Sequence, residues 1–200
     1  MTDIQLRDLI LAGAANLFLK RGYAAVSMRM IASEVYVTTG SLYYYFKDKD
    51  EIVREILDTG HRRVHEEVRS AIESLGDTAS KVSKIKVGIR AHLAAVFEKD
   101  SFPAANIRIF SHVPDHLKRL VRPGRRAYEK FWYQLLVDDN GDEAAMVDAQ
   151  HLTMFLLGAA NWTIEWYRPG RDSLDDIAAD LARTFVLASS RAESPLDMPA

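Results

Sequence analysis

Three helix-capping side chains in close succession constrain this chain more than any other feature. Ser27 and Thr38 each precede a short segment with helical spacing, and Asp48 is followed by Glu51 in the pattern of a capping box. Each cap also ends the segment before it, so the chain must turn between them. The sequence therefore predicts helices over residues 28–34 and 38–46, a tight turn at 35–37 and a long helix from 48 to about 75.

The remaining chain has the same helical character. Residues 4–20 carry apolar side chains at steps of three and four, and Gly22 after two cations is typical of a helix end. Strand patterns are weak, and the stretches 76–81, 138–142 and 168–172 break the periodicity. Further helices are predicted over residues 82–99, 104–112, 116–122, 124–138, 143–167 and 173–191. We therefore expect an all-α fold of about nine helices.

The composition argues against several classes of protein. Without cysteine, the chain has no disulfide, thiolate metal site or cysteine nucleophile. No apolar run approaches the roughly 20 residues that a membrane-spanning helix needs, and the first residues do not resemble a secretory signal. We expect a cytoplasmic protein with no membrane partner. The net charge is -2, so any positive surface for nucleic acid must be local.

No catalytic constellation is visible in the sequence. A nucleophile elbow, a phosphate-binding loop and a dinucleotide glycine pattern are all missing, so neither an enzyme nor a cofactor is expected. His61 and His65 have a spacing compatible with a metal, but no third ligand is evident, and we interpret them as a solvated face with no metal. His151 lies on an apolar segment and is interpreted as a core or pocket histidine.

The two short helices and their turn favour a helix-turn-helix DNA reader with the third helix in the major groove. That helix carries small hydroxyl side chains, a glycine that allows close backbone approach, and tyrosines that reach phosphates or thymine methyl groups. Leu42 and Phe46, four residues apart, should lie in the core, and Tyr45 should be partly buried.

The segment GYAAVSMRMIASEVYVTTGSLYYYFKDKDEI resembles the signature of the TetR family, and the resemblance extends over roughly residues 6–57. It implies a DNA-facing set from the second helix to the start of the fourth, where Lys49 matches a phosphate-binding position. The residues expected at DNA are Ser27, Arg29, Thr38, Thr39, Gly40, Ser41, Tyr43, Tyr44, Lys47 and Lys49. The expected partner is a palindromic operator.

One position departs from the family pattern. Tyr36 stands where the family usually has glycine in the turn, and a positive φ there costs other residues roughly 1 kcal/mol or more. Two interpretations stay open: the turn is distorted, or Tyr36 itself touches the DNA backbone. Tyr45 also replaces the more common histidine.

The last two predicted helices favour a homodimer. The segment 143–167 is apolar nearly all round, and the final helix carries an apolar stripe, so the pair suits a four-helix interface. The alternative is that both stripes are only monomer core. Residues expected at the dimer interface are Leu152, Leu156, Ala160, Ile177, Leu181 and Phe185.

The second half, through RRAYEKFWYQLL and LLGAANWTIEWYRPGRDSLDDIAADL, resembles TetR-type repressors of fatty-acid or steroid breakdown, many of which sense acyl-CoA thioesters. Candidates for binding CoA phosphates are Arg122, Arg125, Arg126 and Arg168. The alternative, which is favoured for any single arginine, is a solvated basic face or pairing with Asp115, Glu129 and the acidic stretch 172–180. Candidates for lining an apolar pocket are Ile107, Phe110, Phe131, Leu135, Phe155, Trp162 and Trp166.

Together these features predict a ligand-responsive repressor. We expect a helix-turn-helix DNA-binding domain over residues 1–50, a connecting helix over 51–76, a ligand-binding and dimerisation domain over 77–191 and a disordered tail over 192–200. The alternatives are a constitutive dimeric DNA-binding protein without an effector, and a sensor of a hydrophobic small molecule that lacks CoA.

Overall fold

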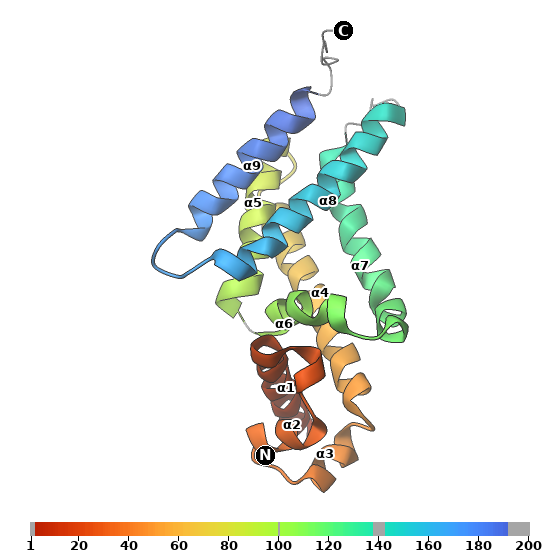
Figure 1. Ribbon diagram of the computed structural model, residues 1–200. Coiled ribbons are helices and arrows are strands. Elements are labelled where there is room, and N and C mark those ends of the chain that lie inside the picture. Colours follow the sequence, from red (N-terminus) through yellow and green to blue (C-terminus); the bar gives the residue numbers. More distant parts are fainter. Residues whose placement is uncertain (1–2, 100, 138–142, 192–200) are drawn as a thin grey trace. The chain divides into compact units, whose positions relative to one another are not determined.

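The computed structural model describes residues 3–99, 101–137 and 143–191. These residues form nine α-helices with one π-helical and one 3-10 segment and contain no strand, which confirms the all-α expectation (Figure 1). The helices are α1 (Asp3–Ala25), α2 (Met28–Glu34), α3 (Thr39–Tyr45), α4 (Lys49–Glu73), α5 (Lys81–Ala94), α6 (Ser101–Ile109), α7 (Asp115–Leu136), α8 (Glu143–Trp166) and α9 (Leu174–Arg191). The shorter segments are η1 (Ala95–Lys99) and η2 (Phe110–His112).

The three predicted caps begin the helices as expected. Ser27 Oγ accepts the N–H of Met30 at 3.3 Å, Thr38 Oγ1 accepts that of Ser41 at 3.0 Å, and Asp48 Oδ1 accepts that of Glu51 at 2.9 Å. Each bond satisfies a backbone donor that has no partner inside its own helix. The start positions of α2, α3 and α4 therefore follow from side chains within three residues of each helix start.

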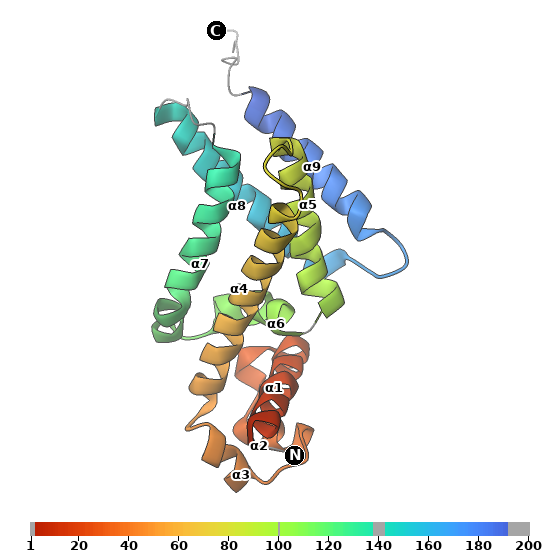
Figure 2. The ribbon, with the colours of Figure 1, turned by 180° about the vertical axis from the view of Figure 1, so that it is seen from behind.

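The described residues divide into two compact units that do not follow the order of the chain. Unit 1 comprises Met1–His65 and Ala95–Arg126, and unit 2 comprises Glu66–Ala94 and Ala127–Ala200. In unit 1, α6 packs along α1, as the two views agree (Figures 1 and 2). The sequence assigned α6 to the sensing domain, whereas its packing partner belongs to the helix-turn-helix half.

The core of unit 1 holds the two short helices in place. Phe18 of α1, Ile31 of α2, Leu42 of α3 and Phe46 after it are all 0% exposed. Asn106 of α6 donates to the carbonyl of Leu57 at 2.7 Å, so a buried polar side chain is satisfied inside this core. Helices as short as α2 and α3 depend on such packing for their stability.

In unit 2, α5, α8 and α9 pack against one another (Figure 2). Trp132 of α7 is 1% exposed and is among the largest fully buried side chains. A Cβ added at Gly88 of α5 would lie 2.9 Å from Trp132 Cη2 and 3.0 Å from Ile72 Cδ1. Glycine therefore allows the indole ring to sit against α5, where a methyl group would force it aside.

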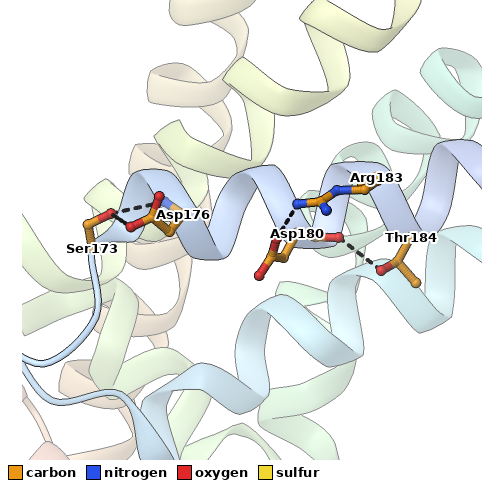
Figure 3. A network of polar contacts seen from close by, with 5 residues as sticks. All are labelled: Ser173, Asp176, Asp180, Arg183 and Thr184. Atoms are coloured by element: carbon orange, nitrogen blue, oxygen red, sulfur yellow. Dashed lines mark hydrogen bonds and ion pairs between the residues drawn. The ribbon is translucent and has the colours of Figure 1, made fainter.

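The start of α9 is fixed by its own first turn (Figure 3). Ser173 Oγ accepts the N–H of Asp176 at 3.0 Å and donates to Asp176 Oδ2 at 2.6 Å. Further along the helix, Asp180 pairs with Arg183, and its carbonyl accepts the hydroxyl of Thr184 at 2.9 Å (Figure 3). These bonds stay within α9, which agrees with the predicted helix start near residue 173.

One helix prediction is wrong. The sequence predicts separate helices over 116–122 and 124–138, but α7 runs unbroken from Asp115 to Leu136 with Pro123 inside it. A proline inside a helix removes one backbone hydrogen bond and strains the preceding turn. Leu117 and Val121 before the proline and Tyr128 after it are all buried, so the apolar stripe continues across it. Packing of this stripe outweighs the local breaking signal.

Two predicted features lie outside the described residues: the breaker at 138–142 and the tail at 192–200. Within the described ranges, no helix is long and apolar enough to cross a membrane.

Candidate nucleic-acid interface and sensing half

Helix α3 presents one face to the core and another to solvent. Leu42 and Phe46 are 0% exposed, while Tyr43 and Tyr44 are 53% and 77% exposed. Tyr45 is partly buried, and its hydroxyl donates to Asp3 Oδ1 at 3.0 Å. These positions confirm the core assignment of Leu42 and Phe46 and the partial burial of Tyr45. The two exposed tyrosines are therefore available to an external partner.

The first turn of α3 is accessible and contains a glycine that the fold does not require. Thr38 and Gly40 are exposed, and Thr39 and Ser41 are partly exposed. A Cβ added at Gly40 would find Thr38 Oγ1 as its nearest neighbour at 3.8 Å, which is ordinary contact. Glycine in a helix costs roughly 0.5–1 kcal/mol relative to alanine. No contact within the described structure explains why this position carries it.

The predicted cations differ in what they contact. Arg29 and Lys47 are exposed and form no side-chain polar contact with the described residues. Lys49 instead donates from Nζ to the carbonyls of Tyr23 and Val26, both at 3.1 Å, and lies 4.0 Å from the centre of the Tyr23 ring. Burial lowers the pKa of Lys49. Its ammonium group thus joins the end of α1 to the start of α4.

A polar cluster around Asp50 supports this junction. Asp50 Oδ1 accepts the hydroxyl of Tyr23 at 3.1 Å, and Asp50 Oδ2 lies 2.8 Å from His116 Nε2 at the start of α7. Desolvation, and then the bond to Asp50, raises the pKa of Tyr23 to about 12. The cluster links three segments of unit 1 that are distant in sequence. Nothing in the local pattern indicated it.

The turn between α2 and α3 is regular, so the interpretation as a distorted turn is wrong. The N–H of Val37 donates to the carbonyl of Ala32 at 2.9 Å, and that of Tyr36 donates to the carbonyl of Ser33 at 3.3 Å. This pair of bonds is the Schellman ending of a helix, whose next residue adopts the left-handed conformation. Tyr36 does so with a φ of 56° and is 97% exposed.

His61 is not on a solvated face, contrary to the sequence-based interpretation. Its Nε2 is buried and has no hydrogen-bond partner among the described residues. Its ring lies 6.4 Å from that of Phe110, whose face is covered by the guanidinium of Arg125 at 4.4 Å. Desolvation, and then the charge of Arg125, lowers the pKa of His61 to about 4.

Two of the predicted pocket residues, Ile107 and Phe110, belong to unit 1, where both are partly buried.

Unit 2 contains a buried polar network that the sequence analysis missed. His92 Nδ1 lies 2.8 Å from the hydroxyl of Tyr128, and His92 Nε2 lies 3.2 Å from Asn161 Oδ1. Burial lowers the pKa of His92 to about 4 and raises that of Tyr128. Because the amide oxygen can only accept, the neutral ring donates from Nε2 and accepts the phenol proton at Nδ1. The only signal in the sequence is that His92 continues the apolar stripe of Ile85 and Ile89.

The predicted pocket residues of unit 2 fall into two groups. Phe131 and Leu135 of α7 are partly buried. Phe155, Trp162 and Trp166 of α8 are 63%, 65% and 46% exposed. The last three therefore do not line the interior of unit 2.

Most of the predicted dimer residues are buried within the single chain. Leu156 and Ala160 of α8 are 0% and 2% exposed, and Ile177 and Phe185 of α9 are 9% and 8% exposed. Leu152 and Leu181 are partly buried. The buried members pack inside unit 2, so they are core residues of a single chain. Because α8 is apolar on nearly all sides, its sequence gave no indication of which face packs inward.

The exposed face of α8 is itself apolar. Met154, Gly158, Trp162 and Trp166 follow one another at steps of four, and Phe155 adjoins them. His151, predicted to be a core or pocket residue, is exposed, and its ring stacks on that of Phe155 at 6.3 Å.

The four predicted phosphate-binding arginines are not equivalent. Arg122 and Arg126 are exposed, whereas Arg125 is partly buried against Phe110. Arg168 donates to the carbonyls of Tyr167 at 2.8 Å and Glu165 at 3.3 Å, so it caps the end of α8. Among the described residues, no group of three or more metal-binding side chains occurs.

Comparison with known proteins agrees with this architecture. Residues 10–56 match the bacterial regulatory proteins of the tetR family, and residues 78–188 match the tetracyclin repressor-like C-terminal domain. The HTH-type transcriptional repressor KstR2 of Rhodococcus jostii is 29% identical over 196 residues, which cover 90% of this chain and 89% of that protein.

Two solved structures share the fold. The ketosteroid transcriptional regulator KstR2 of Mycobacterium tuberculosis matches with a TM-score of 0.68 and 20% identity over 95% of both chains. AibR, in complex with isovaleryl coenzyme A and operator DNA, matches with a TM-score of 0.74 and 19% identity over 91% of this chain and 97% of that one. Because the C-terminal family match alone spans more than half of the chain and a helix-turn-helix match precedes it, the chain belongs to the TetR family of DNA-binding transcriptional regulators.

Proposed function

We propose that this protein is a cytoplasmic, homodimeric repressor that leaves its operator when an acyl-CoA thioester of lipid or steroid breakdown binds. In this proposal residues 1–50 bind DNA, residues 51–76 connect, and residues 77–191 bind the effector and the second subunit. The observation that carries it is the exposed first turn of α3, with a glycine at position 40 that the fold does not need.

Gly40 supports a close approach of the α3 backbone to DNA. A residue without a side chain is useful where an external surface must come within contact distance of the backbone. The exposed hydroxyl of Thr38 and the exposed rings of Tyr43 and Tyr44 lie on the same short helix or at its cap. Arg29 and Lys47 supply positive charge for phosphates on either side of α3 in the sequence.

The DNA-binding proposal is tested by selecting duplexes from a random-sequence pool with the purified wild-type protein. We expect a palindromic sequence to be enriched. Gly40→Ala should raise the free energy of unfolding by up to about 1 kcal/mol, because alanine favours helix, and should weaken binding of the selected duplex at least tenfold. Gly124→Ala, at an open position of α7, is the matched control and should leave the affinity unchanged. If the protein retains no duplex even at low salt, the proposal is wrong.

For the second subunit, we propose the exposed face of α8 in place of the residues that the sequence suggested. A contiguous row of exposed large apolar side chains is typical of a surface that a partner covers. Met154, Phe155, Trp162 and Trp166 form such a row, and Gly158 lets a second helix come close. A two-fold axis through this face would bring the same residues of both chains together.

Sedimentation of variants tests this interface. Trp162→Glu places a charge in the row and should convert the dimer to a monomer at micromolar concentration while the helical content is retained. Lys86→Glu, an exposed site on α5, is the control for an added negative charge and should leave the dimer intact. A dimer that persists in Trp162→Glu would exclude this face.

Two kinds of observation support an acyl-CoA effector. The relatives include a KstR2 repressor that aligns over both halves of the chain, and the AibR structure contains isovaleryl coenzyme A. In this chain, Arg122 and Arg126 are exposed and available to phosphates, whereas Arg125 and Arg168 would exchange their present contacts for them. Within unit 2, partly buried Phe131 and Leu135 are the candidates for contacts with the acyl group.

Thermal shift measurements with acyl-CoA thioesters, free CoA and the matching free acids test the effector class. A thioester that binds the folded protein should raise the melting temperature with the logarithm of its concentration above Kd, and should release the selected duplex in parallel. Stabilisation by free acids alone would point to a hydrophobic effector without CoA. If no compound releases DNA, the protein is a constitutive DNA binder.

A further inference from the structure

Tyr36 occupies a backbone position that disfavours its side chain. It is the first residue after the Schellman ending of α2, with a φ of 56°. Glycine is the usual residue there because it adopts this conformation without steric conflict, and asparagine is the common second choice. The bonds from Val37 to Ala32 and from Tyr36 to Ser33 are both formed, so the turn keeps its regular geometry and the tyrosine bears the strain.

The phenol ring stabilises nothing within the described part of the chain. It is 97% exposed and forms no hydrogen bond, ion pair or ring contact with the described residues. The apolar closure of the turn comes from its neighbours: Val35 is 7% exposed and Val37 is partly buried. A bulky residue that strains the backbone and makes no internal contact indicates a role outside the chain.

The position of Tyr36 next to the start of α3 indicates DNA as the partner outside the chain. Two residues later, Thr38 caps α3, and the first turn of α3 is the surface proposed above to meet DNA. Tyrosine hydroxyls are common donors to DNA phosphates. We propose that Tyr36 donates from its hydroxyl to a backbone phosphate beside the site of α3, and that this contact is why the turn carries tyrosine. This inference rests on the proposed DNA-binding function.

Three substitutions separate this role from a structural one. Tyr36→Gly and Tyr36→Asn relieve the strained conformation, and Tyr36→Phe keeps the ring but removes the hydroxyl. The probe is the duplex selected from the random pool by the wild-type protein, with affinity measured by fluorescence anisotropy at several salt concentrations. Lys47→Ala is the control for loss of a charged phosphate contact.

We expect Tyr36→Gly to raise the melting temperature by about 2–4 °C and to weaken binding about tenfold at every salt concentration. The dependence of affinity on salt should keep its slope, because tyrosine carries no charge and releases no counterion. Lys47→Ala should instead reduce that slope by about 1. Tyr36→Phe should lose as much affinity as Tyr36→Gly, and equally for selected and unrelated duplexes, since a phosphate contact reads no bases.

Other results would overturn the inference. If Tyr36→Gly binds the duplex as tightly as the wild type, Tyr36 does not touch DNA and a protein partner becomes the better explanation. If Tyr36→Phe keeps full affinity, the hydroxyl makes no phosphate contact. A lower melting temperature in both Tyr36→Gly and Tyr36→Asn would show that the side chain is needed for folding. Failure of the wild type to enrich any duplex would instead overturn the DNA-binding function itself.

Discussion

The caps of the helix-turn-helix in unit 1 and the buried network of His92 in unit 2 show two different ways of satisfying polar groups. In the reader, Ser27 and Thr38 bond to backbone groups three residues away. In unit 2, His92 bonds to Tyr128 and Asn161, which are 36 and 69 residues distant. A bond within one helical turn can be predicted from neighbouring residues in the sequence, whereas a bond between helices depends on how those helices pack. The helix starts of the helix-turn-helix could therefore be predicted from the sequence, whereas the network of His92 could be found only in the structure.

The largest expected change in the free energy of unfolding comes from a substitution in unit 2. Trp132→Ala should reduce the free energy of unfolding by about 3–5 kcal/mol, because a large buried ring is lost and a cavity remains beside Gly88. Urea denaturation followed by circular dichroism measures this loss. Trp162→Ala is the matched control, since that ring is 65% exposed in the single chain. Equal losses in the two variants at concentrations where the protein is monomeric would contradict the assigned burial.

Two histidines, partly buried His61 in unit 1 and buried His92 in unit 2, should make stability depend on pH. The pKa values of His61 and His92 are lowered from 6.5 to about 4 in the folded protein. Between these values the unfolded chain binds more protons, so stability is complete above about pH 6.5 and falls as the pH decreases towards 4. The slope is about 1.4 kcal/mol per pH unit for each histidine, or roughly 2 kcal/mol each between pH 6.5 and 5.

Glutamine at either position keeps a polar side chain but cannot titrate in this range. The two histidines together should make the unfolding free energy lower at pH 5 than at pH 7. We expect His92→Gln and His61→Gln each to remove about half of this difference. An unchanged slope in His92→Gln would mean that the ring is accessible to protons in the folded state. The comparison of the two variants assigns the pH dependence to one unit or the other.

A smaller loss of unfolding free energy is expected where helices pack too closely for an added methyl group. Gly88→Ala should cost about 1–3 kcal/mol, because its Cβ would lie 2.9 Å from the Trp132 ring. Gly158→Ala, with nothing within 4 Å, should be neutral or slightly stabilising in the monomer. Thermal melting at low protein concentration distinguishes the two. A neutral Gly88→Ala would show that the packing around Trp132 can relax.

The smallest expected loss of unfolding free energy comes from a substitution in the helix-turn-helix. Thr38→Ala removes the bond to the N–H of Ser41 and should cost about 1 kcal/mol, the usual value of a helix cap. Thr38→Ser, which keeps the accepting oxygen, should cost less than half of that. Hydrogen exchange of the α3 amides reports the loss locally. If the cap variant destabilises the protein as much as Trp132→Ala, the distinction between local caps in the helix-turn-helix and long-range packing in unit 2 is wrong.

Individual residues show where sequence reasoning reached its limit. The starts of α2, α3 and α4 and the core positions of Leu42 and Phe46 were predicted correctly, whereas the regular left-handed turn at Tyr36 was not. Lys49 was predicted at a DNA phosphate, but its ammonium group lies on the carbonyls of Tyr23 and Val26. A long flexible side chain reaches several neighbours, and only the packing of α1 against α4 selects one.

The family resemblance also carried information that the residues alone did not. It implied the DNA-facing set from Ser27 to Lys49, and the structure leaves every residue of that set at least partly exposed. It gave no reliable guide to the face of α8. There the residues expected in a pocket are exposed, and most of those expected at the dimer interface are buried, because a helix apolar on all sides has no face that its sequence distinguishes.

By itself, the sequence determined an all-helical chain with a helix-turn-helix near its start, because caps, a Schellman ending and apolar spacing act between residues at most five positions apart. Tertiary structure alone decided the burial of His61 and His92, the continuation of α7 through Pro123 and the inward face of α8. These features depend on which distant side chains fill the space around them. Close packing resolves that choice only when all the helices of a unit are present together.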